Sequence, residues 1–473
     1  MRVRPISAII IAALGLVAWG LLSYMANTVA ATMFLVFICI VALLLTKPSE
    51  NIFILLFMVA FFVFLLGKPM MVELTGEDNS FYAVKIPDEV TQHTYFLMTL
   101  SMAFVFVGYQ IAKYIKSENR ISAFRMNISD VMVDRIRYAS KLAALVFGGA
   151  VFVLNVEKAV FVSAYGYLES YLGRASRFPG FVSLLAELYP TSIAIFLSTL
   201  PSKKECKIPI YMYVIVMGLY LLTGKRYEAV AAILLLVLYF VLRNKTDEEP
   251  WIQRKHVIGL GLSVPFLMVF LISMESWRAG NAVEASFSQL LMEFFDSVGI
   301  SSIIISYEDM FHDELAARDV WFSFGNMWRS LNGNAIAQML GADKVYASQT
   351  IENALYGHSL SSAIMYKVNP ARMLSGGGLG SCYIAELMCD FSSPGVAIGS
   401  AVLGVVMQKC SQFKKGRFLQ NFMVVFIAMN MFRVPRDSFD FFFYPLFGVK
   451  NIMLFALMYI MANAKSFRIA LRK

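Results

Sequence analysis

The sequence has 473 residues, of which 58% are hydrophobic and only 15% charged. A soluble domain is roughly 45–50% apolar and about 25% charged, so this composition excludes a soluble globular protein and predicts an integral membrane protein. The formal net charge of +9 does not indicate a nucleic-acid partner, because basic residues accumulate in the cytoplasmic loops of membrane proteins.

Long apolar runs recur from one end of the chain to the other, and none alternates with the period of two that marks a barrel strand. The pattern predicts an all-α transmembrane helical bundle. We expect twelve spans, because runs approaching the roughly 20 residues that cross a bilayer lie near 6–26, 29–46, 51–72, 94–112, 142–163, 180–200, 208–223, 229–242, 256–274, 384–408, 418–432 and 445–464. The first run lacks a convincing cleavage site and is interpreted as a retained span.

One polar stretch of about a hundred residues interrupts this apolar pattern. It divides the chain into residues 1–274 with nine spans, a large loop at 275–380, and residues 381–473 with three spans. With an even number of spans, most Lys and Arg fall in loops on the side of both termini, which predicts cytoplasmic termini and a periplasmic loop. Two amphipathic runs, 287–298 and 320–331, predict helices of this loop that lie on the bilayer surface.

The topology depends on the apolar stretch 208–242, which only Lys225, Arg226 and Glu228 interrupt. A single long helix would place the basic loops at 409–417 and 465–473 outside, against the positive-inside rule. A hairpin that turns at Gly224 keeps them inside. Each arm is then shorter than a relaxed span, so we expect Lys225 and Arg226 at the depth of the outer headgroups.

Cationic residues in short outer turns are the first candidate site residues. Charge at this depth is costly unless it is paired, hydrated or bound to an anion. The alternative is that these side chains simply anchor the protein to lipid phosphates. Arg226 departs most from that alternative because apolar residues flank its short turn, and guanidinium binds phosphate in bidentate fashion. The candidates are Lys225, Arg226, Arg278, Arg433, Arg436, Arg174 and Arg177.

A carboxylate pair near the outer end of the tenth span provides candidate bases. Glu386 and Asp390 are four residues apart and share one helix face. Either could accept a proton from a hydroxyl group, or both could form salt bridges with neighbouring arginines. His358 is a rival base, although a lone histidine is more often structural.

No metal framework is apparent in the sequence. The five cysteines contain no Cys-x-x-Cys motif, and the four histidines share no ligand spacing. The acidic run from Glu308 to Glu314 is more typical of a solvated surface than of a metal site. We therefore predict no metal and no cofactor.

Two motifs carry a resemblance to a known family. The turn Leu222-Thr-Gly-Lys-Arg-Tyr227 resembles the short outer turn with an arginine in bacterial O-antigen polymerases (Wzy-type) and the related O-antigen ligases. The stretch from Gly376 to Gly395, in which glycines lead to Ala385-Glu386, is similar to the corresponding stretch of the polymerases. The layout of many spans with one large outer loop late in the chain is also similar.

The resemblance implies a glycosyltransferase of the bacterial inner membrane that polymerises polysaccharide repeats. Its donor and acceptor would be polyprenyl-pyrophosphate-linked oligosaccharides, with membrane lipids, a chain-length regulator and a flippase as further partners. Arg226 would bind the pyrophosphate leaving group and Glu386 would be the base, with Asp390 and His358 as alternatives. The rival interpretations are an O-antigen ligase and a lipid-linked oligosaccharide flippase or secondary transporter, but a transporter would be expected to show an inverted repeat.

Overall fold

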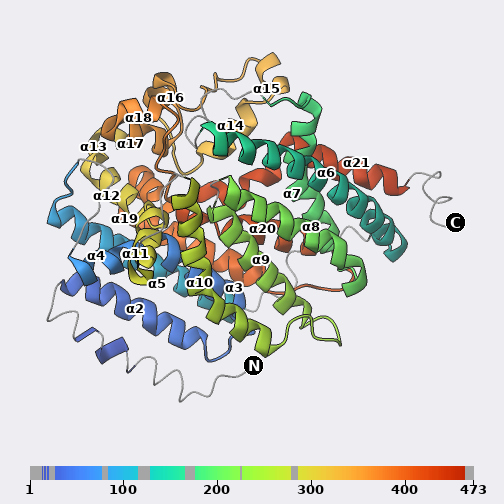
Figure 1. Ribbon diagram of the computed structural model, residues 1–473, viewed down its shortest axis with the longest axis horizontal. Coiled ribbons are helices and arrows are strands. Elements are labelled where there is room, and N and C mark those ends of the chain that lie inside the picture. The colour runs from blue at the N-terminus through green and yellow to red at the C-terminus, as the bar shows by residue number, and fades with distance from the viewer. Residues whose placement is uncertain are drawn as a thin grey trace.

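The computed structural model describes residues 13, 15–17, 19–20, 27–76, 84–115, 128–165, 176–223, 226–278 and 286–463. Within these ranges the regular structure is entirely helical, which confirms the predicted all-α class (Figure 1). We call residues 275–380 the polar segment. The helices that begin before it are α2 (Thr28–Leu44), α3 (Ile52–Phe61), the π-helix η1 (Phe62–Leu66), α4 (Gly67–Thr75), α5 (Asp88–Tyr114), α6 (Asp130–Tyr165), α7 (Gly180–Ser198), α8 (Lys203–Leu222), α9 (Arg226–Arg243) and α10 (Arg254–Arg278). The last residues of α10 extend into the polar segment.

The remaining helices belong to the polar segment and to the C-terminal part of the chain. Within the polar segment lie α11 (Phe287–Val298), α12 (Ser301–Met310), α13 (His312–Ala316), α14 (Gly325–Asn332), α15 (Ala335–Met339), α16 (Ile351–Tyr356), α17 (Leu360–Val368) and α18 (Pro370–Leu374). After it come α19 (Tyr383–Lys409), α20 (Phe418–Met431), the 3-10 helices η4 (Val434–Arg436), η5 (Phe439–Phe442) and η6 (Tyr444–Phe447), and α21 (Val449–Asn463). The short helices α13 to α18 gather along the upper side of the molecule in Figure 1.

Seven helical stretches in the described part of the chain are long and apolar enough to cross a membrane. They are Ile52–Thr75, Asp88–Tyr114, Asp130–Tyr165, Gly180–Ser198, Lys203–Leu222, Tyr383–Lys409 and Phe418–Arg436. Each lies where a span was predicted, so the protein is a multi-pass membrane protein. Helices α2 and α21 are shorter apolar helices, and α9 and α10 occupy predicted spans without belonging to the seven. Because the predicted first span, 6–26, lies largely outside the described residues, the count of twelve stays a prediction.

The stretch 208–242 is a hairpin, as predicted. Helix α8 begins with a capping box, in which Ser202 and Glu205 satisfy each other's backbone N–H groups, and it ends at Leu222. Helix α9 begins at Arg226 and packs against α8. Residues 224 and 225 of the turn lie outside the described residues.

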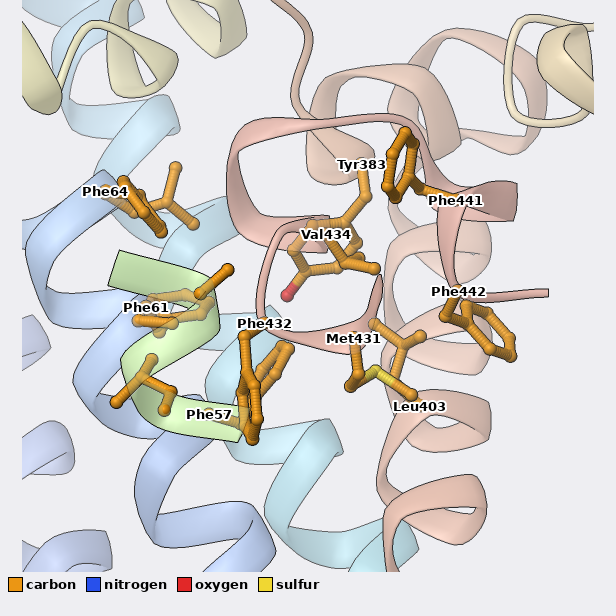
Figure 2. Packing of buried hydrophobic residues seen from close by; sticks show 14 of the residues in the cluster. Phe57, Phe61, Phe64, Tyr383, Leu403, Met431, Phe432, Val434, Phe441 and Phe442 are labelled. Atoms are coloured by element: carbon orange, nitrogen blue, oxygen red, sulfur yellow. The ribbon is translucent and has the colours of Figure 1, made fainter. Parts of the chain in front are cut away.

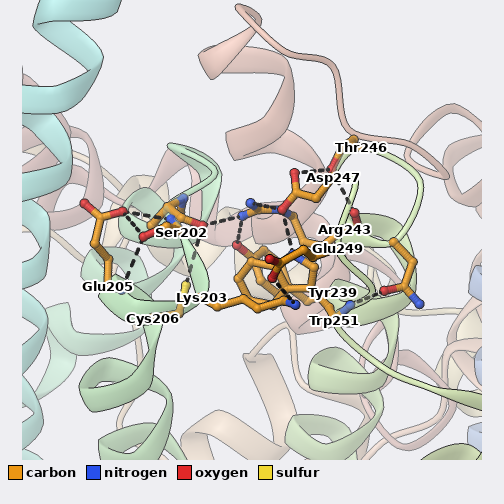
Figure 3. A network of polar contacts seen from close by, with 12 residues as sticks. Ser202, Lys203, Glu205, Cys206, Tyr239, Arg243, Thr246, Asp247, Glu249 and Trp251 are labelled. Atoms are coloured by element: carbon orange, nitrogen blue, oxygen red, sulfur yellow. Dashed lines mark hydrogen bonds and ion pairs between the residues drawn. The ribbon is translucent and has the colours of Figure 1, made fainter.

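A buried arginine fixes the end of this hairpin that is opposite to its turn (Figure 3). Arg243, the last residue of α9, donates hydrogen bonds to the carbonyl of Pro201 at 2.9 Å and to the hydroxyl of Tyr239 at 2.9 Å. It also pairs with Asp247 at 2.5 Å, which accepts a bond from the indole of Trp251 at 2.6 Å. These contacts tie α9 to the α7–α8 turn and set where the hairpin's other end lies.

Helices α5 and α19 approach each other closely. A Cβ atom on Gly404 would lie 2.0 Å from the carbonyl oxygen of Val105, and one on Gly108 would lie 2.1 Å from that of Ala401. Glycine at both positions allows the two backbones to touch, as is common between membrane helices.

Beside this pair, aromatic side chains enclose the segment that follows α20. Figure 2 shows Val434 between Phe61 on one side and Phe441 on the other, and all three side chains are buried. Phe432 packs against Phe53 with ring centroids 5.5 Å apart. This packing holds η4 against η1 and so places Arg433 and Arg436, which flank Val434.

The polar segment is packed against the bundle more closely than its sequence suggested. The buried side chains of α11, Leu290, Phe294, Phe295 and Val298, form the predicted apolar face. This face is covered by protein, since α11 packs on α4 and η1 and the ring of Phe295 contacts that of Phe62 at 5.8 Å. Helices α11 and α12 meet at a bend of 50°, and α12 is buried.

The second amphipathic run is helical only in part. The prediction of a helix over 320–331 is wrong before Gly325, where α14 begins. The reason is a competing hydrogen bond: the N–H groups of Phe322 and Ser323 donate to the carboxylate of Asp390 on α19, which holds these residues in a turn.

Candidate functional site

The start of α9 meets the segment that follows α20. Arg433 pairs with Glu228 through Nη1 and Oε2, 3.0 Å apart, and its Nη2 lies 3.4 Å from the hydroxyl of Tyr227. The same Nη2 lies 3.5 Å from a carboxylate oxygen of Asp437. Tyr227 and Glu228 directly follow Arg226, so two short turns that are about 200 residues apart in sequence lie together.

Two guanidinium groups share one aromatic ring in this region. Arg433 lies over the rings of Tyr227 at 5.0 Å and Phe441 at 4.1 Å, while Arg436 lies over Tyr227 at 5.6 Å. Such cation–π contacts stabilise a partly desolvated cation. We call Arg433, Arg436 and the ring of Tyr227 that they share the cationic cluster, and Glu228 and Asp437 are the counter-ions of Arg433.

One guanidinium donor of the cationic cluster has no acceptor in the part of the chain that the structure describes. The Arg433 side chain is only 17% exposed, and this donor is its buried Nε. A guanidinium in this position has a donor left for an additional oxygen acceptor. Phosphate oxygens suit it, because guanidinium and phosphate match in geometry.

Of the other candidate cations, the structure describes only one side chain, that of Arg177. Arg226 is the first residue of α9 and adjoins Tyr227, and Arg278 is the last residue of α10, but neither side chain is described. Arg174 and Lys225 lie outside the described residues. Arg177 is exposed, and its backbone N–H donates to Glu157 on α6 at 2.8 Å. The structure thus brings Arg433 and Arg436 together at the start of α9.

Glu386 holds the backbone next to the cationic cluster. One carboxylate oxygen accepts a hydrogen bond from the hydroxyl of Ser381 at 2.6 Å, and the other accepts one from the N–H of Phe439 at 2.9 Å. The residue is 1% exposed. Both oxygens are therefore engaged within the protein, and Glu386 positions the 437–439 backbone.

Asp390 and Asp440 bind backbone N–H groups in the same way. The bonds from Phe322 and Ser323 to Asp390 are 3.1 and 2.7 Å long. Asp440 is fully buried and accepts bonds from the N–H of Met327 at 2.7 Å and from the side chain of Asn326 at 3.0 Å. Asp390 thus attaches the residues before α14 to helix α19, and Asp440 attaches α14 to η5. These bonds anchor the polar segment beside the cationic cluster.

Of the two carboxylates that pair with Arg433, Asp437 is slightly more exposed than Glu228. Its side chain is 24% exposed, and one oxygen accepts the N–H of Ser438 at 3.0 Å. Burial raises the pKa of Asp437 to about 6, although the neighbouring Arg433 acts in the opposite direction. A carboxylate with this pKa is mostly ionised at pH 7 and still basic enough to accept a proton.

His358 belongs to the polar segment. Its ring stacks on Trp328 with centroids 4.0 Å apart, and Nδ1 lies 3.4 Å from the carbonyl oxygen of Trp321. Burial lowers its pKa, which favours the neutral imidazole at pH 7. The neutral ring has one nitrogen available as a proton acceptor, so His358 stays a candidate base.

Sequence reasoning missed three residues that matter here. Glu228 and Asp437 lie close to arginines in the sequence, but the pairing of Glu228 with Arg433 requires two distant segments to meet. Lys68 is buried within an apolar span and pairs with Asp296 of α11. A signal for Lys68 was present, because a single lysine inside a long apolar run is costly and indicates a partner.

The acidic run 308–314 forms histidine–carboxylate pairs. Glu308 lies 2.7 Å from Nδ1 of His312, and Asp309 lies 2.9 Å from Nδ1 of His93. In the described part of the chain, no three His, Cys, Asp or Glu side chains are grouped as metal ligands. The cationic cluster, with the carboxylate of Asp437 beside Arg433, is the candidate site.

Comparison with known proteins gave one match. The family model described as O-antigen polysaccharide polymerase Wzy matches residues 6–466, which include the cationic cluster and the whole polar segment. No curated protein and no solved structure matches the chain.

Proposed function

Because the chain belongs to the O-antigen polysaccharide polymerase (Wzy) family, we propose that its cationic cluster binds the diphosphate of a lipid-linked oligosaccharide while a glycosidic bond is formed. A Wzy polymerase acts on lipid-linked repeat units in the membrane and is a glycosyltransferase-type enzyme. The observation that carries the proposal is the partly buried pair Arg433 and Arg436 around Tyr227, which directly follows Arg226 at the start of α9.

In the proposed reaction, a hydroxyl of the acceptor sugar attacks the anomeric carbon of the donor. The bond between that carbon and the diphosphate oxygen breaks, and the polyprenyl diphosphate leaves with the electron pair. Arg433 and Arg436, with Arg226, stabilise the growing negative charge, which is greater in the transition state than in the substrate. Lys225, Arg278, Arg174 and Arg177 are proposed as further contacts to phosphate or sugar.

The proton of the acceptor hydroxyl goes to a carboxylate. We propose Asp437 for this step, because it is partly exposed and lies against Arg433. Glu386 was the base predicted from sequence and remains the alternative, with Asp390 and His358 behind it. For Glu386 to act, the acceptor would have to displace Ser381 or the N–H of Phe439. A positioning role for Glu386 requires no such displacement.

The proposed chemistry does not require a metal ion. Diphosphate is a competent leaving group, and guanidinium groups supply the positive charge that a divalent cation would otherwise supply. Polymer formation by the purified enzyme is therefore expected to be unchanged in excess chelator. A loss of activity that added Mg²⁺ restores would contradict this part of the proposal.

The function is tested by deleting the gene and restoring it with variants. Deletion is expected to leave surface glycans with a single repeat unit, and the wild-type gene should restore long chains. Arg226→Ala should fail to restore them, while Arg417→Ala, an exposed arginine between α19 and α20, should succeed. Loss of all core-attached glycan would indicate a ligase instead, and accumulation of inward-facing lipid-linked units would indicate a flippase.

A further inference from the structure

Lys68 is a buried cation that has no role in the reaction proposed above. It is 5% exposed and lies within the apolar stretch Ile52–Thr75, where its ammonium group pairs with the carboxylate of Asp296. A buried ion pair contributes little to stability compared with apolar residues of similar volume. Charged groups within membrane helices are more often functional.

The backbone around this pair is shaped so that α4 and α11 approach closely. The π-helix η1 ends immediately before Gly67, and π-helical turns are frequent at functional sites. A Cβ on Gly67 would lie 2.1 Å from the ring of Phe295, and one on Gly299 would lie 2.7 Å from Cβ of Lys68. Glycine on both helices thus brings Lys68 against the end of α11.

A second cation reaches the same turn of α11. Arg436 of the cationic cluster donates a hydrogen bond from Nη1 to the carbonyl oxygen of Val298, the last residue of α11. Val298 is two residues from Asp296, which is only about 3 Å along a helix axis. Lys68 and Arg436 thus both bind acceptors in the last turn of α11, and η4, which contains Arg436, packs on η1, which directly precedes α4.

The last turn of α11 therefore presents two oxygen acceptors to two cations. One is the carboxylate of Asp296, and the other is a terminal carbonyl that carries the negative end of the helix dipole. A diphosphate also presents several anionic oxygens within a short distance of one another. The turn of α11 therefore presents to the two cations part of what such a ligand would present, with one anionic and one dipolar acceptor.

We propose that Lys68 and Arg436 together bind the diphosphate of the lipid-linked substrate, and that Asp296 and Val298 of α11 occupy this pair in its absence. The inference rests on the proposed function and adds Lys68 to its substrate-binding residues. When substrate binds, phosphate oxygens replace the Asp296 carboxylate and the Val298 carbonyl as partners of the two cations. Helix α11 then moves away from them about the 50° bend between α11 and α12. Asp296 is then a competitor of the substrate.

The test measures binding of a sugar-free polyprenyl diphosphate to the purified full-length protein, with polyprenyl monophosphate as the comparison lipid. Lys68→Met is expected to weaken diphosphate binding about ten-fold, the loss of one charge-assisted contact. Asp296→Asn should strengthen it, because the competing carboxylate is gone. Lys450→Met removes a lysine from an exposed pair with Glu187 and should bind as the wild type does.

The charge-swapped variant Lys68→Asp/Asp296→Lys separates binding from anchoring. It restores an ion pair between α4 and α11, so an anchoring role predicts wild-type binding. Our proposal predicts binding as weak as in Lys68→Met. The apolar pair Lys68→Met/Asp296→Leu provides a second variant without a buried single charge, and it should also bind weakly.

Different results would contradict this inference and the proposed function. If Arg433→Ala loses diphosphate binding while the charge-swapped variant binds normally, Lys68 is an anchor and only the inference is wrong. If the wild-type protein binds the diphosphate no better than the monophosphate, the proposed function is itself contradicted.

Discussion

Replacing Arg433 by alanine is expected to reduce polymer formation by about 10²–10³-fold, the usual cost of removing one group that stabilises transition-state charge. Arg433 is the best-connected cation of the cluster, since it contacts Glu228, Asp437 and the rings of Tyr227 and Phe441. Arg433→Lys keeps the charge but loses the planar, bidentate geometry, so partial activity is expected. The measurement is chain length on a gel, with the amount of protein in the membrane determined in parallel.

A matched variant distinguishes lost chemistry from lost structure. Removing Arg433 leaves Glu228 without its partner, and an unpaired, partly buried carboxylate is destabilising. Arg433→Ala/Glu228→Gln removes that leftover charge, while Asp437 keeps Arg436 as a nearby cation. If the arginine binds substrate, the double variant stays inactive although part of its thermal stability recovers. Recovery of long chains in the double variant would show that Arg433 acts only as a structural partner of Glu228.

Asp437→Asn is expected to abolish most activity, by about 10²–10⁴-fold for a lost general base. The wild-type pH profile provides the accompanying signature. A base works only when deprotonated, and the pKa of Asp437 is about 6, so activity should be high at pH 7 and fall as the pH drops through about 6. The residual activity of Asp437→Asn should lack this step.

Glu386→Gln is the comparison that decides between the two proposed bases. The variant keeps the size of the side chain and one acceptor oxygen, so a positioning role predicts reduced activity with the wild-type pH step retained. A flat profile in Glu386→Gln together with an intact step in Asp437→Asn would transfer the base assignment to Glu386.

The helices could be predicted because their signals are local. Apolar length predicts each of the seven candidate spans, and the charges at 225–228 predict the hairpin of α8 and α9. The boundary of α14 could not be predicted in this way. The residues before Gly325 have a helical pattern, but Asp390, far away in sequence, binds their N–H groups.

The type of site, arginines that bind an anion, could be proposed from the sequence, but the contacts of these arginines could not. Charge at the depth of the headgroups indicated Arg226, Arg433 and Arg436 as candidate anion ligands. Their counter-ions depend on tertiary structure, because Glu228 and Arg433 meet only when the hairpin packs beside α20. Spacing likewise placed Glu386 and Asp390 on one helix face, but it could not show that backbone N–H groups would occupy their carboxylates.

The central claim is that diphosphate binds at the cationic cluster, and crosslinking tests it most directly. A polyprenyl diphosphate that carries a photoreactive group next to the phosphates is irradiated with the purified protein, and the labelled peptides are identified. The account predicts labelling within 226–228 and 433–440, competed by unlabelled diphosphate and lost in Arg433→Ala. Labelling that is confined to other segments and unaffected by Arg433→Ala would contradict it.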